Sequence, residues 1–219
     1  MRSMSPVERA DLYAAGTKVQ YEHETTLMLQ GHIGRELFLL LDGFVKVTAV
    51  SESGTQVLLA FRAKGDLVGE FSVLDDKPRS ATVTAVGAVV AVRVSRTRFR
   101  DFLQQHPGTL QKITGSVLSK MRSATGHRIA VRALDAKGRL ARVLLDLTLR
   151  YGEDVGEGIV IGMPLAQFEL GALASVSEST TERILKEFRE AGLVITKYRR
   201  ILVQKPEALR ALPGSLETP

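Results

Sequence analysis

The chain has 219 residues, of which 44% are apolar and 25% charged, a composition typical of a globular protein with a packed core. It has no cysteine, which excludes disulfides, cysteine-ligated metal sites and cysteine nucleophiles. No run of about 18 uncharged apolar residues occurs, and no hydrophobic block follows the N-terminus, so we expect no membrane span, no signal peptide and a cytoplasmic location.

The net charge of +6 suits a protein that binds a polyanion, but the charge is unevenly distributed. Residues 137–219 carry 12 Lys and Arg against 11 Asp and Glu, whereas residues 1–136 carry 18 against 13. Charge alone is therefore only a weak indication of nucleic-acid binding.

A β-rich region is predicted from about residue 17 to residue 95, after a short helix over 5–15 with Ser5 as N-cap and Pro6 in its first turn. Turn signals recur at intervals of about 8–12 residues, which is typical of a β-sandwich or barrel. The predicted strands are Phe38–Leu41, Phe44–Val50, Val57–Phe61, Ala81–Val86 and Val89–Val94. The predicted breaks are Gly31–Gly34, Asp42-Gly43, Ser53-Gly54, Lys64–Asp66 and Gly87.

A long helix is predicted over 107–134, where apolar residues recur at spacings of three and four. The stripe consists of Leu110, Ile113, Val117, Met121 and Ala124. The matching helix of a second copy would cover this stripe in a two-stranded coiled coil, and the alternative is that the stripe packs on the chain's own β-domain. Gly115 and Gly126 lie inside the helix, where each costs about 1 kcal/mol relative to Ala.

The last third of the chain predicts a hinge, an amphipathic helix and a helix-turn-helix. The hinge is Leu134–Ala136, the helix is Gly138–Tyr151, and an acidic, glycine-rich loop over Gly152–Gly158 follows. Two short helices then meet at Ser175-Val176-Ser177, where Ser177 caps the second helix. Gly171 is small where the two helices cross.

This helix-turn-helix predicts DNA binding, because its second helix starts with short polar residues suited to the major groove. Two short strands flank a basic turn after it, as in a wing whose tip contacts phosphates; the alternative for these bases is a solvated turn. The expected DNA contacts are Ser177, Glu178, Ser179, Thr180, Arg183, Lys197, Arg199 and Arg200.

A second motif pairs Gly69-Glu70-Phe71 with Arg79-Ser80-Ala81. Backbone N–H groups at a short helix N-terminus face an anion, and the guanidinium of Arg79 matches two phosphate oxygens. Ser80 adds a hydroxyl donor, and Glu70 can accept from a ribose 2′-OH. Taken singly, Arg79 could be a surface arginine and Glu70 a helix-capping acid. Together they resemble the phosphate-binding cassette of cyclic-nucleotide-binding domains.

Over about residues 17–210 the chain resembles the cyclic-AMP receptor protein (Crp–Fnr) family of bacterial transcription regulators. The resemblance implies an α+β fold: an N-terminal cyclic-nucleotide-binding β-roll over 1–106, a central dimerisation helix over 107–134 and a C-terminal winged helix-turn-helix over 135–219. It also implies an allosteric, cytoplasmic homodimer that binds a palindromic double-stranded DNA site and contacts RNA polymerase. The implied effector is cyclic AMP or cyclic GMP, with no required cofactor.

Two departures from the family pattern concern specificity. The family's Thr-Ser pair that contacts adenine is replaced by Ala124-Thr125, and one lost hydrogen bond is worth about 0.5–1.5 kcal/mol. Lys120 lies one turn earlier, where the family often has an arginine near the ligand. The alternative interpretation is that Lys120 is simply an exposed helix residue. The expected ligand set is Gly69, Glu70, Phe71, Arg79, Ser80, Lys120 and Thr125.

The second departure lies at the start of the recognition helix, where Glu178 replaces the family's first arginine. A carboxylate accepts from cytosine N4 and cannot bind guanine bidentately, so we predict a DNA site unlike the usual family consensus. Arg183 matches the family's second arginine.

No nucleophile–base set or paired carboxylates support an enzyme, and the scattered histidines, His23, His32, His106 and His127, predict no metal site. Two alternatives to a ligand-gated regulator stay open. One is a ligand-independent DNA-binding regulator of the same fold with a vestigial pocket, and the other is a cyclic-nucleotide-gated enzyme or interaction subunit.

Overall fold

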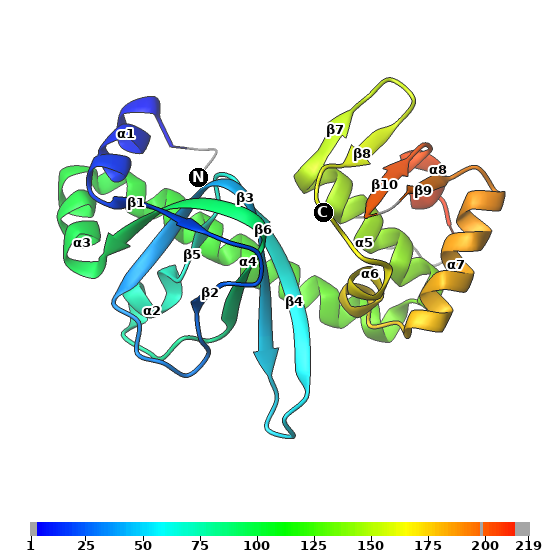
Figure 1. Ribbon diagram of the computed structural model, residues 1–219, viewed down its shortest axis with the longest axis horizontal. Coiled ribbons are helices and arrows are strands. Elements are labelled where there is room, and N and C mark those ends of the chain that lie inside the picture. The colour runs from blue at the N-terminus through cyan, green and yellow to red at the C-terminus, as the bar shows by residue number, and fades with distance from the viewer. Residues whose placement is uncertain (1–3, 198, 213–219) are drawn as a thin grey trace. The chain divides into compact units, whose positions relative to one another are not determined.

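The computed structural model describes residues 4–197 and 199–212. Its contacts divide the chain into two compact units, residues 1–122 and 123–219. Figure 1 shows a β-rich first unit and a second unit in which helices surround a small sheet. The boundary falls inside the long helix α4, Pro107–Ala133, whose two halves therefore belong to different units.

The first unit is built on an antiparallel sheet in the order β1-β6-β3-β4, with β2 paired to β6 and β5 to β3. Successive side chains of a strand point to opposite faces, and both faces of β3 are buried. Leu37 and Leu39 pack with the helices, whereas Phe38 and Leu40 pack inside the roll. The strands are β1 Thr17–Tyr21, β2 Thr26–Met28, β3 Glu36–Val50, β4 Gln56–Ala63, β5 Leu67–Val68 and β6 Thr82–Ser95.

Two of the predicted breaks are wrong, because β3 runs through Gly43 and β6 runs through Gly87. Both glycines have positive φ, +79° and +80°, and the register shifts beside them: Asp42 pairs with Val90 but Phe44 pairs with Val86. Such bulges bend a strand without ending it. The glycines therefore curve the two longest strands into a roll instead of separating four short ones.

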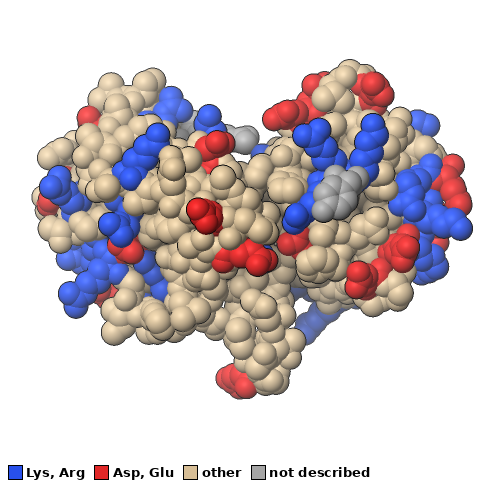
Figure 2. Space-filling view, in the orientation of Figure 1, with Lys and Arg blue, Asp and Glu red and all other residues tan. Residues whose placement is uncertain are grey.

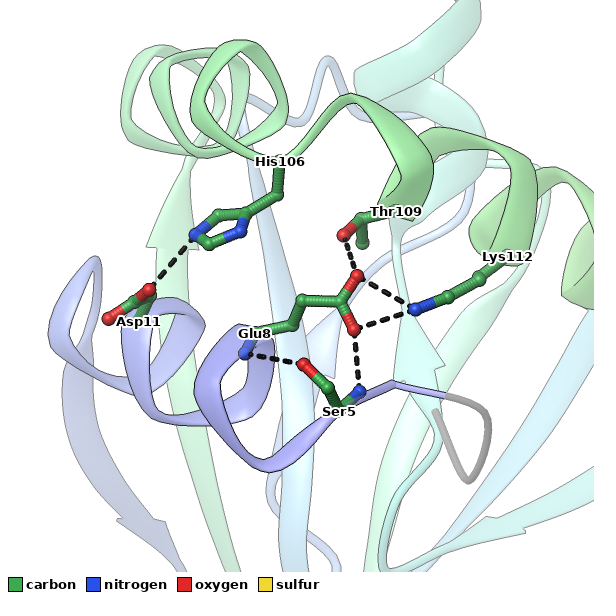
Figure 3. Close-up of polar contacts among 6 residues, drawn as sticks. All are labelled: Ser5, Glu8, Asp11, His106, Thr109 and Lys112. Atoms are coloured by element: carbon green, nitrogen blue, oxygen red, sulfur yellow. Dashed lines mark hydrogen bonds and ion pairs between the residues drawn. The ribbon is translucent and has the colours of Figure 1, made fainter.

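The N-terminal helix α1, Pro6–Ala14, has Ser5 as its N-cap as predicted, and a buried polar cluster holds it to α3, Arg96–Gln105, and α4. In this cluster (Figure 3), the Glu8 carboxylate accepts from Lys112 Nζ at 2.7 and 2.8 Å and from Thr109 Oγ1 at 2.7 Å. The Lys112 hydrogen bond is the main cause that lowers the pKa of Glu8 to about 2. His106 Nε2 lies 2.9 Å from Asp11 Oδ2.

The apolar stripe of α4 is only partly covered within the chain. Ile113 is buried in the first unit, which fits the alternative of packing on the β-domain for this residue. The exposed apolar residues of α4 are Leu110, Leu118, Met121, Ile129 and Val131. Most of the stripe therefore has no cover among the described residues of the chain.

The second unit places the four helices that follow α4 beside a sheet of order β7-β8-β10-β9. Asp135 caps α5. Of the four residues predicted to point inward, Leu140, Leu144 and Leu147 are buried and Val143 is half-buried. The predicted loop over Gly152–Gly158 is wrong at its start, because its first three residues pair with β8. The elements are α5 Ala136–Tyr151, β7 Gly152–Asp154, β8 Ile159–Ile161, α6 Gln167–Ala174, α7 Glu178–Glu190, β9 Val194–Lys197, β10 Arg200–Val203 and α8 Pro206–Arg210.

Candidate functional site

Arg79 is the centre of the predicted cassette, and its side chain is buried with a relative exposure of 5%. Its Nη1 donates to the Gly69 carbonyl at 2.8 Å and to Ser72 Oγ at 2.5 Å, and its Nη2 donates to the Glu36 carbonyl at 2.5 Å. Burial lowers the pKa of the Arg79 guanidinium, and Glu36 and Glu70 act in the opposite direction. The guanidinium thus ties the start of α2, Glu70–Asp75, to the first residue of β3.

Two glycines make room for this guanidinium. A Cβ at Gly34 would collide with Arg79 Nε and Cζ, and a Cβ at Gly69 would lie 2.6 Å from Arg79 Nη1. Gly69 also has φ +84° at the N-cap of α2, a conformation that favours glycine. The sequence analysis included Gly69 in the cassette for its contact with a ligand and Gly34 only as part of a turn, so neither contact with Arg79 was predicted.

Glu70 and Lys120 form a second buried contact in the cassette. Lys120 Nζ donates to Glu70 Oε1 at 2.6 Å and to the Leu67 carbonyl at 2.7 Å. The relative exposures of the Glu70 and Lys120 side chains are 5% and 16%, and Lys120 Nζ also lies 5.9 Å from the centroid of the Phe71 ring. The alternative that Lys120 is an exposed helix residue is therefore wrong, because it connects α4 to the first turn of α2.

The structure brings together five of the seven predicted ligand residues, namely Gly69, Glu70, Phe71, Arg79 and Lys120. Ser80 is exposed, and Thr125 is exposed on the part of α4 that belongs to the second unit. Sequence reasoning missed Ser72, which lies one turn after Gly69 and accepts from Arg79. The carbonyls of Glu36 and Leu67 leave no signal in a sequence.

The helix-turn-helix folds as predicted, with Ser177 as the N-cap of α7. A Cβ at Gly171 would lie 2.5 Å from Thr181 Oγ1, so α6 and α7 need glycine where they cross. Leu170, Ile184 and Leu185 are buried beneath this crossing.

The first turns of α7 leave their polar side chains available at the surface. Ser177, Glu178 and Ser179 are exposed, and Thr180 is half-buried with a hydrogen bond of 2.9 Å to Ser177 Oγ. The Arg183 side chain is 65% exposed and lies 2.8 Å from Glu187 Oε1. In Figure 2, Lys and Arg side chains lie beside Asp and Glu side chains over the second unit where Figure 1 places α7.

The basic turn lies between β9 and β10, as predicted. Lys197 and Arg200 are paired residues of the two strands and are both exposed. Arg199 is half-buried and has φ +53°, so the backbone turns tightly there. The two strands form the hairpin of the wing, in which β9 is the edge strand and β10 also pairs with β8.

Comparison with known proteins matches both units. Residues 18–106 match the cyclic nucleotide-binding domain, and residues 138–212 match the Crp-like helix-turn-helix domain. The chain belongs to the Crp–Fnr family of transcription regulators. It is thus a DNA-binding regulator with a cyclic nucleotide-binding domain, and the domains and relatives that it matches are those of regulators and not of enzymes.

Two relatives show how far this Crp–Fnr likeness extends. The chain is 25% identical over 191 residues to the CRP-like cAMP-activated global transcriptional regulator of Mycobacterium tuberculosis, covering 87% of this chain and 85% of that protein. It is 26% identical over 186 residues to the cAMP-activated global transcriptional regulator CRP of Salmonella typhimurium, covering 84% and 88%.

Solved structures share the fold at lower identity. FixK2 from Bradyrhizobium japonicum matches with a TM-score of 0.79 at 18% identity, covering 92% of this chain and 99% of that chain. The global regulator CLP of Xanthomonas campestris matches with a TM-score of 0.75 at 18% identity, covering 91% and 99%. At this identity the likeness concerns the fold alone.

In the part of the chain that the structure describes, no group of three or more His, Asp or Glu could hold a metal ion. Every helix in the same residues is too short or too polar to cross a bilayer.

Proposed function

We propose that this Crp–Fnr regulator is gated by a cyclic mononucleotide bound at the cassette of the first unit. The observation that carries the proposal is the convergence of the Arg79 guanidinium and the Glu70 carboxylate on the Gly69 end of α2. An arginine suits a phosphate, and a carboxylate suits a ribose hydroxyl. The relatives described as cAMP-activated make cyclic AMP the first candidate, with cyclic GMP as the second.

Arg79 keeps donors for such a phosphate. Its three hydrogen bonds to protein acceptors use three of the five guanidinium N–H groups. The other two are on Nε and Nη2 of the same planar group, and they are the donors that remain for phosphate oxygens. Ligand binding therefore need not disturb the bonds that hold Arg79.

Unlike Arg79, Glu70 would bind the ligand beside a charged protein partner, because its Oε1 already accepts a hydrogen bond from the Lys120 ammonium. A ribose hydroxyl would donate to this carboxylate beside the ammonium. Lys120 and Phe71 would then border the ligand from α4 and α2, Ser80 would add a hydroxyl group, and Thr125 of a second copy of the chain would approach the base. Ala124 offers no hydrogen bond to a base, so we expect weak discrimination between adenine and guanine.

The second candidate function is a regulator of the same fold that needs no ligand. It is favoured by one observation, namely that Glu70 and Arg79 have buried protein partners at hydrogen-bond distance. The two functions differ in a direct measurement. The affinity for a DNA duplex selected from a random pool by the wild-type protein is measured with and without cyclic AMP and cyclic GMP. An unchanged affinity, together with silent calorimetric titrations of both nucleotides, would establish the second function; cyclic dinucleotides serve as the control.

On the DNA side we propose that α7 reads a palindromic site, with Ser177, Glu178, Ser179, Thr180 and Arg183 near the bases. Lys197, Arg199 and Arg200 of the wing would contact phosphates. A steep fall of affinity with salt is expected for such contacts. Binding that does not depend on salt would contradict the assignment of the wing.

We also propose that residues 107–134 form a dimerisation helix between a nucleotide domain over 1–106 and a DNA-binding domain over 135–219. The support is the set of exposed apolar residues on α4, which a second copy of the helix would cover. Leu118→Glu should convert the dimer into a monomer in sedimentation measurements, and Leu149→Glu, at an exposed leucine of α5, is the control. A dimer is also what we expect to contact RNA polymerase at a promoter.

A further inference from the structure

Arg139, in the first turn of α5, contacts three backbone carbonyls that belong to other elements. Its Nε donates to the Ala174 carbonyl at 2.9 Å and its Nη2 to the Ser175 carbonyl at 3.2 Å. Its Nη1 donates to the Leu134 carbonyl at 2.9 Å. Ala174 is the last residue of α6, and Leu134 follows the last residue of α4. One side chain therefore connects the turn of the helix-turn-helix to the end of the long helix.

The end of α4 contacts the same turn a second time. His127 Nε2 lies 3.4 Å from Ser175 Oγ. Burial lowers the pKa of His127, and Arg142 and Arg139 lower it further while Asp146 raises it. His127 and Ser175 can share a hydrogen bond here, and the tautomer of the ring decides which of them donates. All these groups lie in the second unit, so the last turns of α4 are part of the DNA-binding unit.

Close packing supports this connection. A Cβ at Gly126 would lie 2.8 Å from Arg142 Nη2, so the arginine of α5 passes directly over the backbone of α4. Nη2 is the far end of a flexible side chain, so a larger residue at position 126 would require only that the Arg142 side chain move.

Only a short path leads from Arg139 to the recognition helix. Ser175 has φ +52° and lies three residues before the first residue of α7. Thr181 Oγ1 donates to the Ser177 carbonyl at 2.9 Å, and the Val176 N–H donates to the Gly171 carbonyl at 2.9 Å. A displacement of Ala174 and Ser175 would therefore move the N-terminus of α7 with it.

We propose that Arg139 is a positioning residue for DNA recognition, which fixes the turn before α7 to the end of α4. The proposal rests on the proposed function of α7 as the reading helix. Carbonyls at a helix C-terminus favour a cation, and charged hydrogen bonds are stronger than neutral ones, so a guanidinium suits this position. Its Nε, Nη1 and Nη2 each donate to a carbonyl inside the protein, so we expect Arg139 to act through the turn, and the salt dependence of binding tests whether it contacts DNA phosphates instead.

The test compares Arg139→Ala, Arg139→Lys and the wild-type full-length protein on the same selected duplex, well below each unfolding temperature. We expect Arg139→Ala to weaken sequence-specific binding about tenfold and Arg139→Lys to recover part of the loss, because an ammonium reaches fewer carbonyls. Hydrogen exchange should become faster at residues 175–180 and stay unchanged at the wing. Arg132→Ala, at an exposed arginine near the end of α4, is the matched control and should show neither effect.

Three outcomes would overturn the proposal. An unchanged affinity with a lowered unfolding temperature would make Arg139 a purely structural residue. A slope of log affinity against log salt that falls by about 0.9 would make it a direct phosphate contact. Unchanged hydrogen exchange at residues 175–180 would show that Arg139 does not hold the turn before α7 in place. The proposed function is tested separately, because it fails if Arg183→Ala leaves base preference intact, whatever Arg139→Ala does.

Discussion

The cassette of the first unit and the polar face of α7 in the second unit use similar residue types in opposite ways. In the cassette, Glu70 and Arg79 are buried and bonded to protein groups. On α7, the side chain of Arg183 is 65% exposed, and Glu178 and Ser179 are also exposed. Buried polar groups serve the fold and the ligand together, whereas exposed ones can serve a partner alone. Substitutions in the first region should therefore change stability as well as binding, and substitutions in the second should change binding only.

The largest effect is expected from Arg79→Ala. It leaves the carbonyls of Gly69 and Glu36 and the hydroxyl of Ser72 without their donor, so the free energy of unfolding should fall by about 3–5 kcal/mol. Nucleotide binding should weaken by about 2–5 kcal/mol. Chemical denaturation and calorimetric titration measure the two effects. Arg98→Ala, at an exposed arginine of α3, is the control and should change stability by less than about 0.5 kcal/mol.

If Arg79→Ala leaves both the stability and the nucleotide titration unchanged, the buried groups of the cassette serve neither the fold nor the ligand. The difference between the two regions would then not hold. A loss of stability with unchanged nucleotide binding would instead assign Arg79 to the fold alone and favour the ligand-independent regulator.

Lys120→Met should have the next largest effect, about 3 kcal/mol of unfolding free energy, because it leaves the buried Glu70 carboxylate without its cation. The double variant Lys120→Met/Glu70→Gln removes both charges and should recover a large part of that loss. A double-mutant cycle on the unfolding free energy measures the coupling. Additive effects of the two single substitutions would show that the pair is too well solvated to matter.

What the sequence predicted well is what local chemistry determines. Ser5 and Ser177 cap helices because the capping hydroxyl reaches a backbone N–H three residues away, and Gly171 marks a helix crossing by its size. The heptad-like spacing located α4 to within one residue at its end. These features depend on near neighbours, so one sequence contains them.

What the sequence could not predict depends on partners far along the chain. Gly43 and Gly87 resemble turn residues, and only the pairing of β3 with β6 makes them bulges. The partners of Arg79 include a carbonyl 43 positions away, and Lys120 and Glu70 are separated by 50 positions. Such contacts follow from the fold of the whole unit, which local spacing does not contain.

Arg183→Ala should lower DNA affinity by about 1–3 kcal/mol and leave the stability nearly unchanged. Its ion pair with Glu187 is exposed, and such pairs contribute at most about 0.5 kcal/mol. Binding to a panel of duplexes with single base-pair changes should show preference lost at one position per half-site. Lys186→Ala, with a side chain that is 70% exposed on the same helix, is the control and should keep the preference. A large loss of stability in Arg183→Ala would contradict the comparison, because it would show that an exposed side chain of α7 also serves the fold.

The smallest effect is expected from Glu8, and it should make hydrogen exchange in the first unit depend on pH in a way that exchange in α7 does not. Its pKa is lowered in the folded protein from 4.5 to about 2, chiefly by Lys112, so it stabilises the first unit above pH 4.5. This contribution is lost as the pH falls from about 4.5 to about 2, because the unfolded chain then binds a proton that the folded one does not. Hydrogen exchange at α1 and the start of α4 should therefore become faster over this interval in the wild type. Glu8→Gln, which has no carboxyl group to titrate, should remove that pH dependence at α1 while exchange in α7 responds to acid as before; the same pH dependence in both proteins would show that α1 is held by its apolar contacts and not by the buried carboxylate.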